Sequence, residues 1–190
     1  MEHYCTGPET KRLQHRAFTV DDAEAFFAIN SNPDVMRFTG EPILPSLDAA
    51  RQAIANYPDF DKLGYGRWAS VLKETQTIIG FCGLKYLSDL DAVDVGFRFL
   101  PRNWGRGLAT EACVASLDFG FTTLSLDQIV GFVVPENVAS IRVLEKAGMQ
   151  LDGEFDYDGT LALRYVKRRQ LPANNCVNRS GDSHPIQMDS

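Results

Sequence analysis

Apolar residues recur every three or four positions in four stretches of the chain, the spacing typical of amphipathic helices. The first stretch opens with Thr19 and Asp22, a capping-box-like pair, and the second follows Ser46, a favoured N-cap residue. The last stretch ends at Gly148, a residue suited to a left-handed helix stop. The predicted helices span about residues 19–32, 46–57, 107–122 and 136–148.

Between these helices lie short runs rich in β-branched and aromatic residues, which predict strands. The polar residues 73–76 separate two such runs and indicate an antiparallel hairpin, and Asp158-Gly159 indicates a second one near the end. Strand, helix and strand then follow one another from residue 92 to 135, a βαβ unit, so we predict a mixed α/β sheet flanked by helices, with two helices inserted early. The predicted strands span about residues 66–74, 77–87, 92–100, 127–135, 149–157 and 161–168.

The length of 190 residues and the 44% hydrophobic content predict one domain with one core. We place that domain at residues 13–170, after an N-terminal extension at residues 1–12. Residues 171–190 mix Pro, Asn, Ser, Gly and Asp without periodicity and predict a disordered tail. The start has no apolar run of the kind a signal peptide requires, and no stretch is long enough to span a bilayer, so a soluble cytoplasmic protein is expected.

The net charge of −6 argues against a general nucleic-acid binder, which usually carries a basic face. An acidic chain fits a cationic substrate better, although acidity also serves solubility alone. The cysteines are scattered without a C-x-x-C pair, and no histidine stands at ligand spacing, so we expect no metal site. Cys82 and Cys113 lie in apolar patterns and are interpreted as packing thiols.

The stretch "PRNWGRGLATEA", residues 101–112, joins a strand to a helix through a glycine-rich, basic turn. A helix N-terminus offers unpaired N–H groups and partial positive charge, and Gly105 and Gly107 let an anion approach them closely. Arg102 and Arg106 add charge. An ordinary tight turn that binds no ligand would show the same glycine pattern. Thr110 departs from the dinucleotide fingerprint, and the chain has no G-K-[ST] for a nucleotide P-loop.

Arg102-x-x-Gly105-x-Gly107 matches the [QR]-x-x-G-x-[GA] pyrophosphate loop, and through it the chain resembles the GCN5-related N-acetyltransferases. "DVGFRFLPRNWGRGLATEA" and "NVASIRVLEKAGM" are similar to the two cofactor motifs of the branch that contains ribosomal-protein N-terminal acetyltransferases. The resemblance runs from about Leu13 to Arg168. It implies a mixed, mostly antiparallel sheet with a V-shaped cofactor opening after the fourth strand.

The resemblance also implies the reaction and the donor site. Members transfer acetyl from acetyl-CoA to a primary amine, here a protein N-terminus or a small amine, by direct attack in a ternary complex. A backbone N–H near Phe99 or Leu100 is expected to face the thioester carbonyl, and the turn after it to hold the pyrophosphate. The implied coenzyme A contacts are Phe99, Leu100, Arg102, Gly105, Arg106, Gly107, Ala109, Thr110, Asn137 and Ser140.

Two residues are candidates for catalysis. Asn137 and Ser140 match the branch's N-x-x-S pattern, in which the amide holds pantetheine and the hydroxyl lies near the sulfur as a proton donor. The same two residues also suit an ordinary helix cap and first turn. Asp94 is our candidate general base, acting through a water, because several members carry a glutamate on this strand. A solvated strand aspartate is the alternative.

Other features depart from the family or stay ambiguous. Many members use a tyrosine as the acid, and Tyr157 and Tyr165 match no such spacing here. For Glu111 a structural role is an equal alternative, since an acid near a helix N-terminus is stabilised there. The acids of residues 152–158 either attract a cationic amine to a groove between the early helices and the closing hairpin, or form an ordinary acidic surface.

Asp94 in place of a glutamate and the missing tyrosine spacing motivate a second hypothesis, an acyl-CoA-binding sensor or interaction module with little catalysis. Under either hypothesis we expect no metal, nucleic-acid or membrane partner, and a monomer or homodimer.

Overall fold

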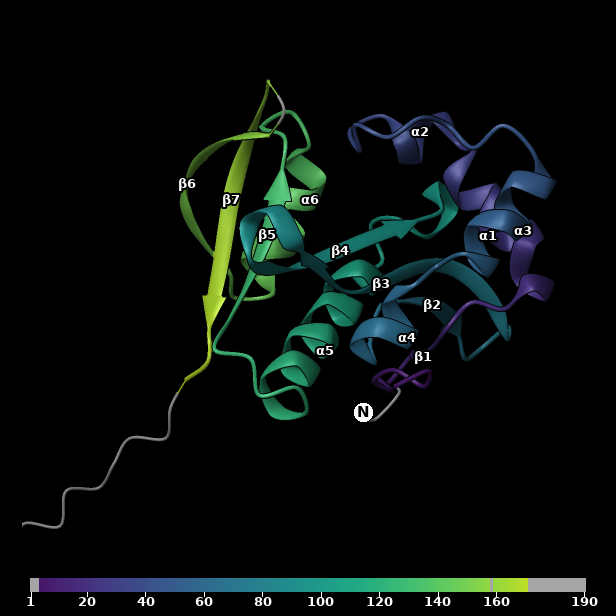
Figure 1. Cartoon of the computed structure of the whole chain (residues 1–190), viewed down its shortest axis with the longest axis horizontal. Helices are drawn as coiled ribbons and strands as arrows, with labels where there is room; N and C mark the ends of the chain where they lie inside the picture. Colours follow the sequence, from purple (N-terminus) through teal and green to yellow (C-terminus); the bar gives the residue numbers. More distant parts are fainter. Residues whose placement is uncertain (1–3, 158, 171–190) are drawn as a thin grey trace, which may run out of the picture.

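The computed structural model describes residues 4–157 and 159–170; the predicted turn residue Asp158 and the predicted tail at 171–190 lie outside them. The described residues form a seven-stranded sheet in the order β1-β2-β3-β4-β5-β7-β6 (Figure 1). Neighbouring strands are antiparallel except β4 and β5, which are parallel. The strands are β1 (Leu13–Arg16), β2 (Arg67–Leu72), β3 (Thr77–Leu87), β4 (Ala92–Phe99), β5 (Gln128–Val133), β6 (Gln150–Tyr157) and β7 (Thr160–Arg168).

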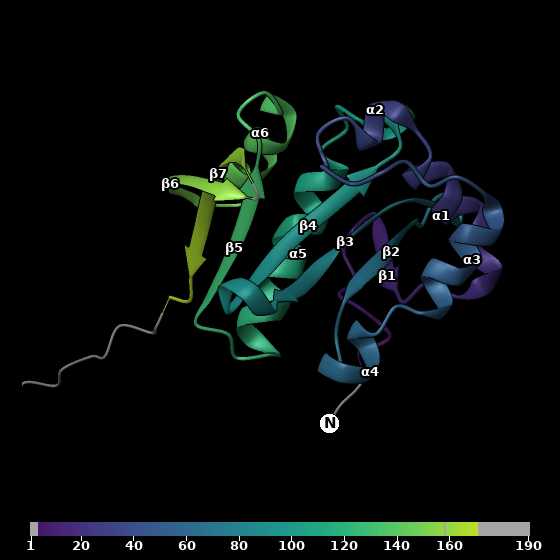
Figure 2. The same ribbon diagram turned by 45° about the horizontal axis from the view of Figure 1, so that its top comes forward.

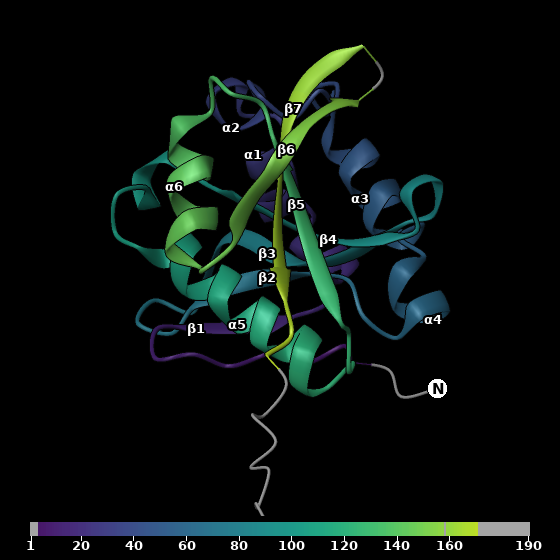
Figure 3. The same ribbon diagram turned by 90° about the vertical axis from the view of Figure 1, so that its left-hand side faces the viewer.

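Helices cover both faces of this sheet, with α5 and α6 on one side and α3 and α4 on the other (Figure 3). The four predicted helices are confirmed as α1, α3, α5 and α6. Ser46 caps α3 by accepting a hydrogen bond from the Ala49 N–H at 3.1 Å, and Gly148 has φ +81°. The helices are α1 (Ala23–Asn30), α2 (Pro33–Met36), α3 (Leu47–Ala55), α4 (Asp59–Leu63), α5 (Leu108–Thr122) and α6 (Val138–Lys146).

Three short elements were not predicted from the sequence. β1 has four residues, too few for a clear alternation, and it is stabilised by pairing with β2. The segment Asn32-Pro33 ends the first predicted helix but also starts α2, because the Asn32 side chain accepts from the N–H groups of Asp34 and Val35. α4 is a single turn ended by Gly64.

The alternation of β4 assigns its side chains to two different faces, as the pattern predicted. Val95 and Phe99 pack in the main core with residues of α5, including Leu108 and Cys113. Asp94 and its alternating neighbours point to the opposite face, where α1 and α3 lie.

β4 and β5 separate soon after they meet. A single register pair, Asp94 with Val130, joins them, and Figure 2 shows the strands spreading apart toward the ends near α2 and α6. Because the strands are parallel, their carboxyl ends lie at the same edge, where α5 follows β4 and α6 follows β5. The βαβ unit thus brings two helix N-termini to one V-shaped opening.

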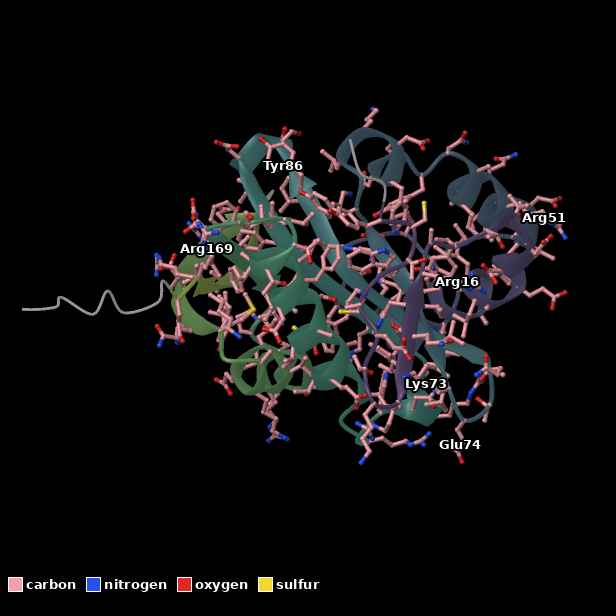
Figure 4. All side chains as sticks on the ribbon, turned by 90° about the horizontal axis from the view of Figure 1, so that it is seen from below. Arg16, Arg51, Lys73, Glu74, Tyr86 and Arg169 are labelled. Carbon is pink, nitrogen blue, oxygen red and sulfur yellow. The ribbon has the colours of Figure 1, made fainter. Side chains whose placement is uncertain are left out.

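The hairpin turns at the two ends of β3 point to opposite edges of the molecule. In Figure 4, Glu74 of the β2–β3 turn lies on the opposite side of the molecule from Tyr86, which is close to the β3–β4 turn.

At the N-terminal end, residues before β1 pack on the sheet: the Trp68 indole N–H donates to the Tyr4 carbonyl at 2.8 Å. Among the described residues, no helix combines the length and apolar character needed to span a bilayer.

Candidate active site

The turn between β4 and α5 leaves several backbone N–H groups without a partner in the helix. Gly105 and Gly107 both have φ +73°, a conformation that side chains with a Cβ rarely adopt. The first bond of α5 runs from the Glu111 N–H to the Gly107 carbonyl at 3.1 Å, so the N–H groups of the three residues between them have no acceptor inside the helix. Arg102 and Arg106 are exposed at this turn. The geometry is that of an anion site at a helix N-terminus.

A clasp from the N-terminal segment holds this turn. The Glu111 carboxylate accepts from the Thr10 hydroxyl at 2.7 Å and from the Arg12 side chain at 2.6 Å, and Arg12 also donates to the Arg106 carbonyl at 2.9 Å. Partial burial alone raises the pKa of Glu111, but the hydrogen bonds from Thr10 and Arg12 outweigh it and lower that pKa. Glu111 therefore has a structural role, tying α5 to residues about a hundred positions earlier.

The backbone N–H groups of Phe99 and Leu100, the two candidate donors to the thioester oxygen, point in opposite directions. The Leu100 N–H donates to the Ile79 carbonyl of β3 at 2.9 Å, so it is not available to a ligand, and this expectation for Leu100 is wrong. Backbone groups alternate in direction along an antiparallel strand, so those of Phe99 face the opening toward β5. The Phe99 carbonyl there accepts from the Trp104 indole at 2.6 Å. The Phe99 N–H remains the candidate donor.

A cavity of about 540 Å³ occupies the opening between β4 and β5. Asp94, Asn137 and Ser140 all line it, so residues from β4 and α6 meet in one space. The Asn137 side-chain oxygen accepts from the Ser140 N–H at 3.1 Å and caps α6. The capping interpretation is therefore correct for that oxygen, while the positions of both side chains still allow contact with a ligand in the cavity.

Asp94 is buried, with only 7% of its surface exposed, so the solvated-aspartate interpretation is wrong. Its carboxylate pairs with the Arg67 guanidinium at 2.7 Å. Burial raises the pKa of Asp94, and this effect outweighs the opposing effects of Arg67 and of a hydrogen bond from the Phe132 N–H. The residue therefore binds a proton more readily than an ordinary aspartate.

Arg67 has room to reach Asp94 because Gly96 has no side chain. A Cβ at Gly96 would lie 2.5 Å from the guanidinium carbon of Arg67, far inside contact distance. The Nε of Arg67 is buried without a hydrogen-bond partner. Sequence reasoning missed Arg67, although a lone arginine at the start of the apolar run "RWASVL" is an available signal.

A second cavity, of about 440 Å³, adjoins the first on the face covered by α1 and α3. Both cavities are lined by Glu41, Arg67, Lys85 and Arg98. Residues of the early helices line the second cavity, and Thr160 and Ala162 of the closing strand line the first. The early helices and the closing strand thus border one continuous region of the molecule.

Several other candidate residues lie apart from these cavities. The Tyr165 hydroxyl donates to Glu145 at 3.3 Å, and Tyr165 lines neither cavity. Asp152 pairs with Arg164 at 3.4 Å, and the Asp156 carboxylate accepts from the Gly159 N–H at 2.6 Å. Asp152 and Asp156 thus contact their own hairpin and line neither cavity, which agrees with the interpretation of an ordinary acidic surface.

The two core cysteines are packing residues. Cys82 and Cys113 are fully buried in the main core, and burial raises the pKa of both thiols, to about 12 for Cys82. Neither is poised as a nucleophile.

The comparisons with known proteins agree with this geometry. Residues 12–150 match the acetyltransferase (GNAT) domain family. The chain belongs to the GNAT acetyltransferase family. It is 34% identical over 151 residues to the uncharacterized N-acetyltransferase YoaA of Bacillus subtilis, covering 76% of this chain and 83% of the relative. It is also 31% identical to the uncharacterized N-acetyltransferase p20 of Bacillus licheniformis, covering 78% of this chain and 85% of that protein.

Solved structures of this family share the fold. A GNAT acetyltransferase from Bacillus anthracis superposes with a TM-score of 0.73 at 26% identity, covering 85% of this chain and 97% of that one. A spermidine N-acetyltransferase from Vibrio cholerae, solved with CoA and spermine, superposes with a TM-score of 0.71 at 21% identity, covering 84% of this chain and 97% of that one. The predicted GNAT fold is confirmed, including the split between β4 and β5, and the protein is an N-acetyltransferase of a family that uses acetyl-CoA.

Proposed function

We propose that this acetyltransferase moves acetyl from acetyl-CoA to a primary amine by direct attack in a ternary complex. One observation carries the proposal: the exposed anion turn of α5 and the cavity lined by Asp94 and Ser140 both lie at the opening between β4 and β5. A donor molecule with a phosphate end and a reactive end therefore has a place for each.

The donor is held mainly by backbone groups. The N–H groups of Leu108, Ala109 and Thr110 donate hydrogen bonds to the pyrophosphate oxygens. Arg102 and Arg106 add positive charge at the rim of the turn. The edge of β4 that faces β5 pairs with the pantetheine arm, and the Asn137 amide holds that arm from α6. The Phe99 N–H donates to the thioester oxygen, where negative charge develops in the transition state.

Asp94 acts as the general base. The amine nitrogen attacks the thioester carbon, so a C–N bond forms while the C–S bond breaks, and the amine loses a proton. Asp94 takes that proton through a water, since an aspartate on this strand is short. The leaving thiolate takes a proton from the Ser140 hydroxyl, which recovers it from solvent.

The test is thiol release that requires both substrates. A panel of N-terminal peptides, polyamines, aminoglycosides and simple amines is mixed with acetyl-CoA, and free thiol is measured. If acetyl-CoA binds but no amine raises thiol above background, the proposal fails. Ser140→Ala is expected to lower kcat about tenfold or more, as loss of a general acid does, with the Kd for acetyl-CoA nearly unchanged.

The branch of the family is part of the proposal. The motif likeness to ribosomal-protein N-terminal acetyltransferases supports a peptide N-terminus as acceptor, and a structural neighbour that is a spermidine N-acetyltransferase supports a small amine. The peptide arms of the panel distinguish these two possibilities.

A second function, an acyl-CoA sensor, is favoured by one contact. The Asp94 carboxylate is already engaged by Arg67 at 2.7 Å, which weakens it as a base. A sensor binds acetyl-CoA by calorimetry yet releases no thiol with any amine of the panel.

A further inference from the structure

The second cavity is mostly apolar. Eleven of its eighteen lining residues are hydrophobic, and its volume of about 440 Å³ falls in the range of small-molecule sites. It lies on the sheet face that carries Asp94 and Arg67, between α1, α3 and α4. Its largest apolar lining residues are Phe18, Phe26, Leu44, Ile54, Phe60 and Phe81.

The charged groups around the two cavities balance. Three carboxylates line one or both cavities, those of Glu41, Asp61 and Asp94, and three cations do so, those of Arg67, Lys85 and Arg98. This region is therefore neutral, unlike the chain as a whole with its net charge of −6.

Two of the three carboxylates are already committed to arginines. Arg67 pairs with Asp94 at 2.7 Å, and Arg98 pairs with Glu41 at 2.7 Å. Arg98 is fixed further, because it donates to the Asn30 side-chain oxygen at 2.7 Å and its guanidinium lies 5.4 Å from the centre of the Phe81 ring. The Glu41 carboxylate is thus occupied by a cation that is itself firmly held.

One acid and one base around the cavities remain outside these pairs. Asp61 and Lys85 take part in no ion pair within residues 4–157 and 159–170. Asp59, whose carboxylate interacts with the Tyr57 hydroxyl, is buried and lines neither cavity. Beyond the reacting amine, each further positive charge on a substrate would meet one unpaired carboxylate, that of Asp61, and one unpaired cation, that of Lys85, so this region offers additional charges no net attraction.

We propose that the acceptor is a primary amine with one positive charge and an apolar body, and that the second cavity holds that body. The inference rests on the proposed acetyl transfer and adds the class of amine. The amine nitrogen lies toward Asp94 at the junction of the cavities, where it first gives its ammonium proton to solvent and then attacks as the neutral amine, while the apolar body contacts the phenylalanines. Polyamines and aminoglycosides carry more positive charge than this neutral region balances and are therefore poorer substrates.

The experiment compares kcat/KM for three amines by thiol release. The probes are 2-phenylethylamine, ethanolamine, which has no apolar body, and spermidine, which has additional charges. We expect 2-phenylethylamine to exceed each of the others by about tenfold or more, since apolar pockets discriminate by about this factor or more for each missing methylene. A peptide beginning with phenylalanine shows whether a peptide N-terminus supplies the same apolar amine.

A matched pair of variants on α3 tests the cavity itself. Ala53 is exposed and lines the cavity, and the neighbouring Gln52 is exposed and does not. Ala53→Glu is expected to lower kcat/KM for 2-phenylethylamine about tenfold and to raise it for spermidine, while Gln52→Glu, which adds the same charge, changes neither.

Each result bears on one level of the proposal. If spermidine or ethanolamine is the better substrate, the apolar-amine inference is overturned and acetyl transfer stands. If Ala53→Glu leaves kcat/KM unchanged for both 2-phenylethylamine and spermidine, the second cavity is not the acceptor site. If no amine releases thiol although acetyl-CoA binds, the proposed function itself fails, and this inference fails with it.

Discussion

The donor turn and the acceptor cavity of this acetyltransferase are built from different material. The turn after β4 is made of backbone: two glycines at positive φ and the first N–H groups of α5. The second cavity is made of side chains from the first four helices, three strands and the loops between them. A site made of backbone needs a short, contiguous pattern, whereas a site made of side chains depends on which distant elements the fold brings together. The two halves should therefore fail in different ways when residues are changed.

The largest expected effect separates chemistry from donor binding. Asp94→Asn removes the proposed base, and we expect kcat to fall by about 10²- to 10⁴-fold. The Kd for acetyl-CoA should stay within about twofold, because Asp94 lies apart from the anion turn. A thiol-release assay measures kcat, and calorimetry measures the Kd for acetyl-CoA. A variant with normal kcat would remove Asp94 from the mechanism.

The next largest effect is on donor binding and not on chemistry. Gly107→Val places a β-branched residue at φ +73° in the turn and should raise the Kd for acetyl-CoA by about 100-fold, since the strained turn closes over its N–H groups. Gly159→Val is the matched control, because Gly159 has φ +80° and open space around it, far along the chain in the β6–β7 turn. Equal losses of affinity in both variants would mean that strain, and not the anion site, is responsible.

A smaller effect concerns pH. Activity that needs an ionised Asp94 falls as the pH drops through the pKa of that residue, which burial raises above its ordinary value. Arg67→Met removes the cation that opposes this rise, so the acid limb of kcat should move to higher pH. Arg51→Met, an exposed arginine of α3 that lines neither cavity, serves as the control. An unmoved limb would show that Asp94 does not control the rate.

The smallest effect on activity comes from the clasp. Glu111→Gln weakens its contacts to Thr10 and Arg12 and should cost about 1–2 kcal/mol of unfolding free energy at pH 7. The pKa of Glu111 is lowered in the fold, so its stabilisation is present above its unfolded pKa and is lost as the pH falls through the folded one. Denaturant unfolding at pH 7 and pH 3 should show the difference between the two proteins shrink at pH 3.

Most of the fold was readable from local patterns, and the acceptor site was not. The helix and strand periods, the cap at Ser46 and the stop at Gly148 act within a few residues, so a sequence shows them directly. The direction of the Leu100 N–H was missed because it depends on the register of β4 against β3. The partners of Asp94 and Arg98 were missed for the same reason: Arg67 and Asn30 reach them only through the folded sheet and α1.

The bare backbone of Gly96 has an evolutionary consequence. Because any Cβ there would collide with the Arg67 guanidinium, Gly96 cannot gain a side chain while that guanidinium stays paired with Asp94. Among relatives, we expect an arginine at the first residue of β2 to be inherited together with a glycine in the middle of β4. A lineage that replaces the glycine should also have replaced the arginine, and with it the environment of its acidic residue on β4.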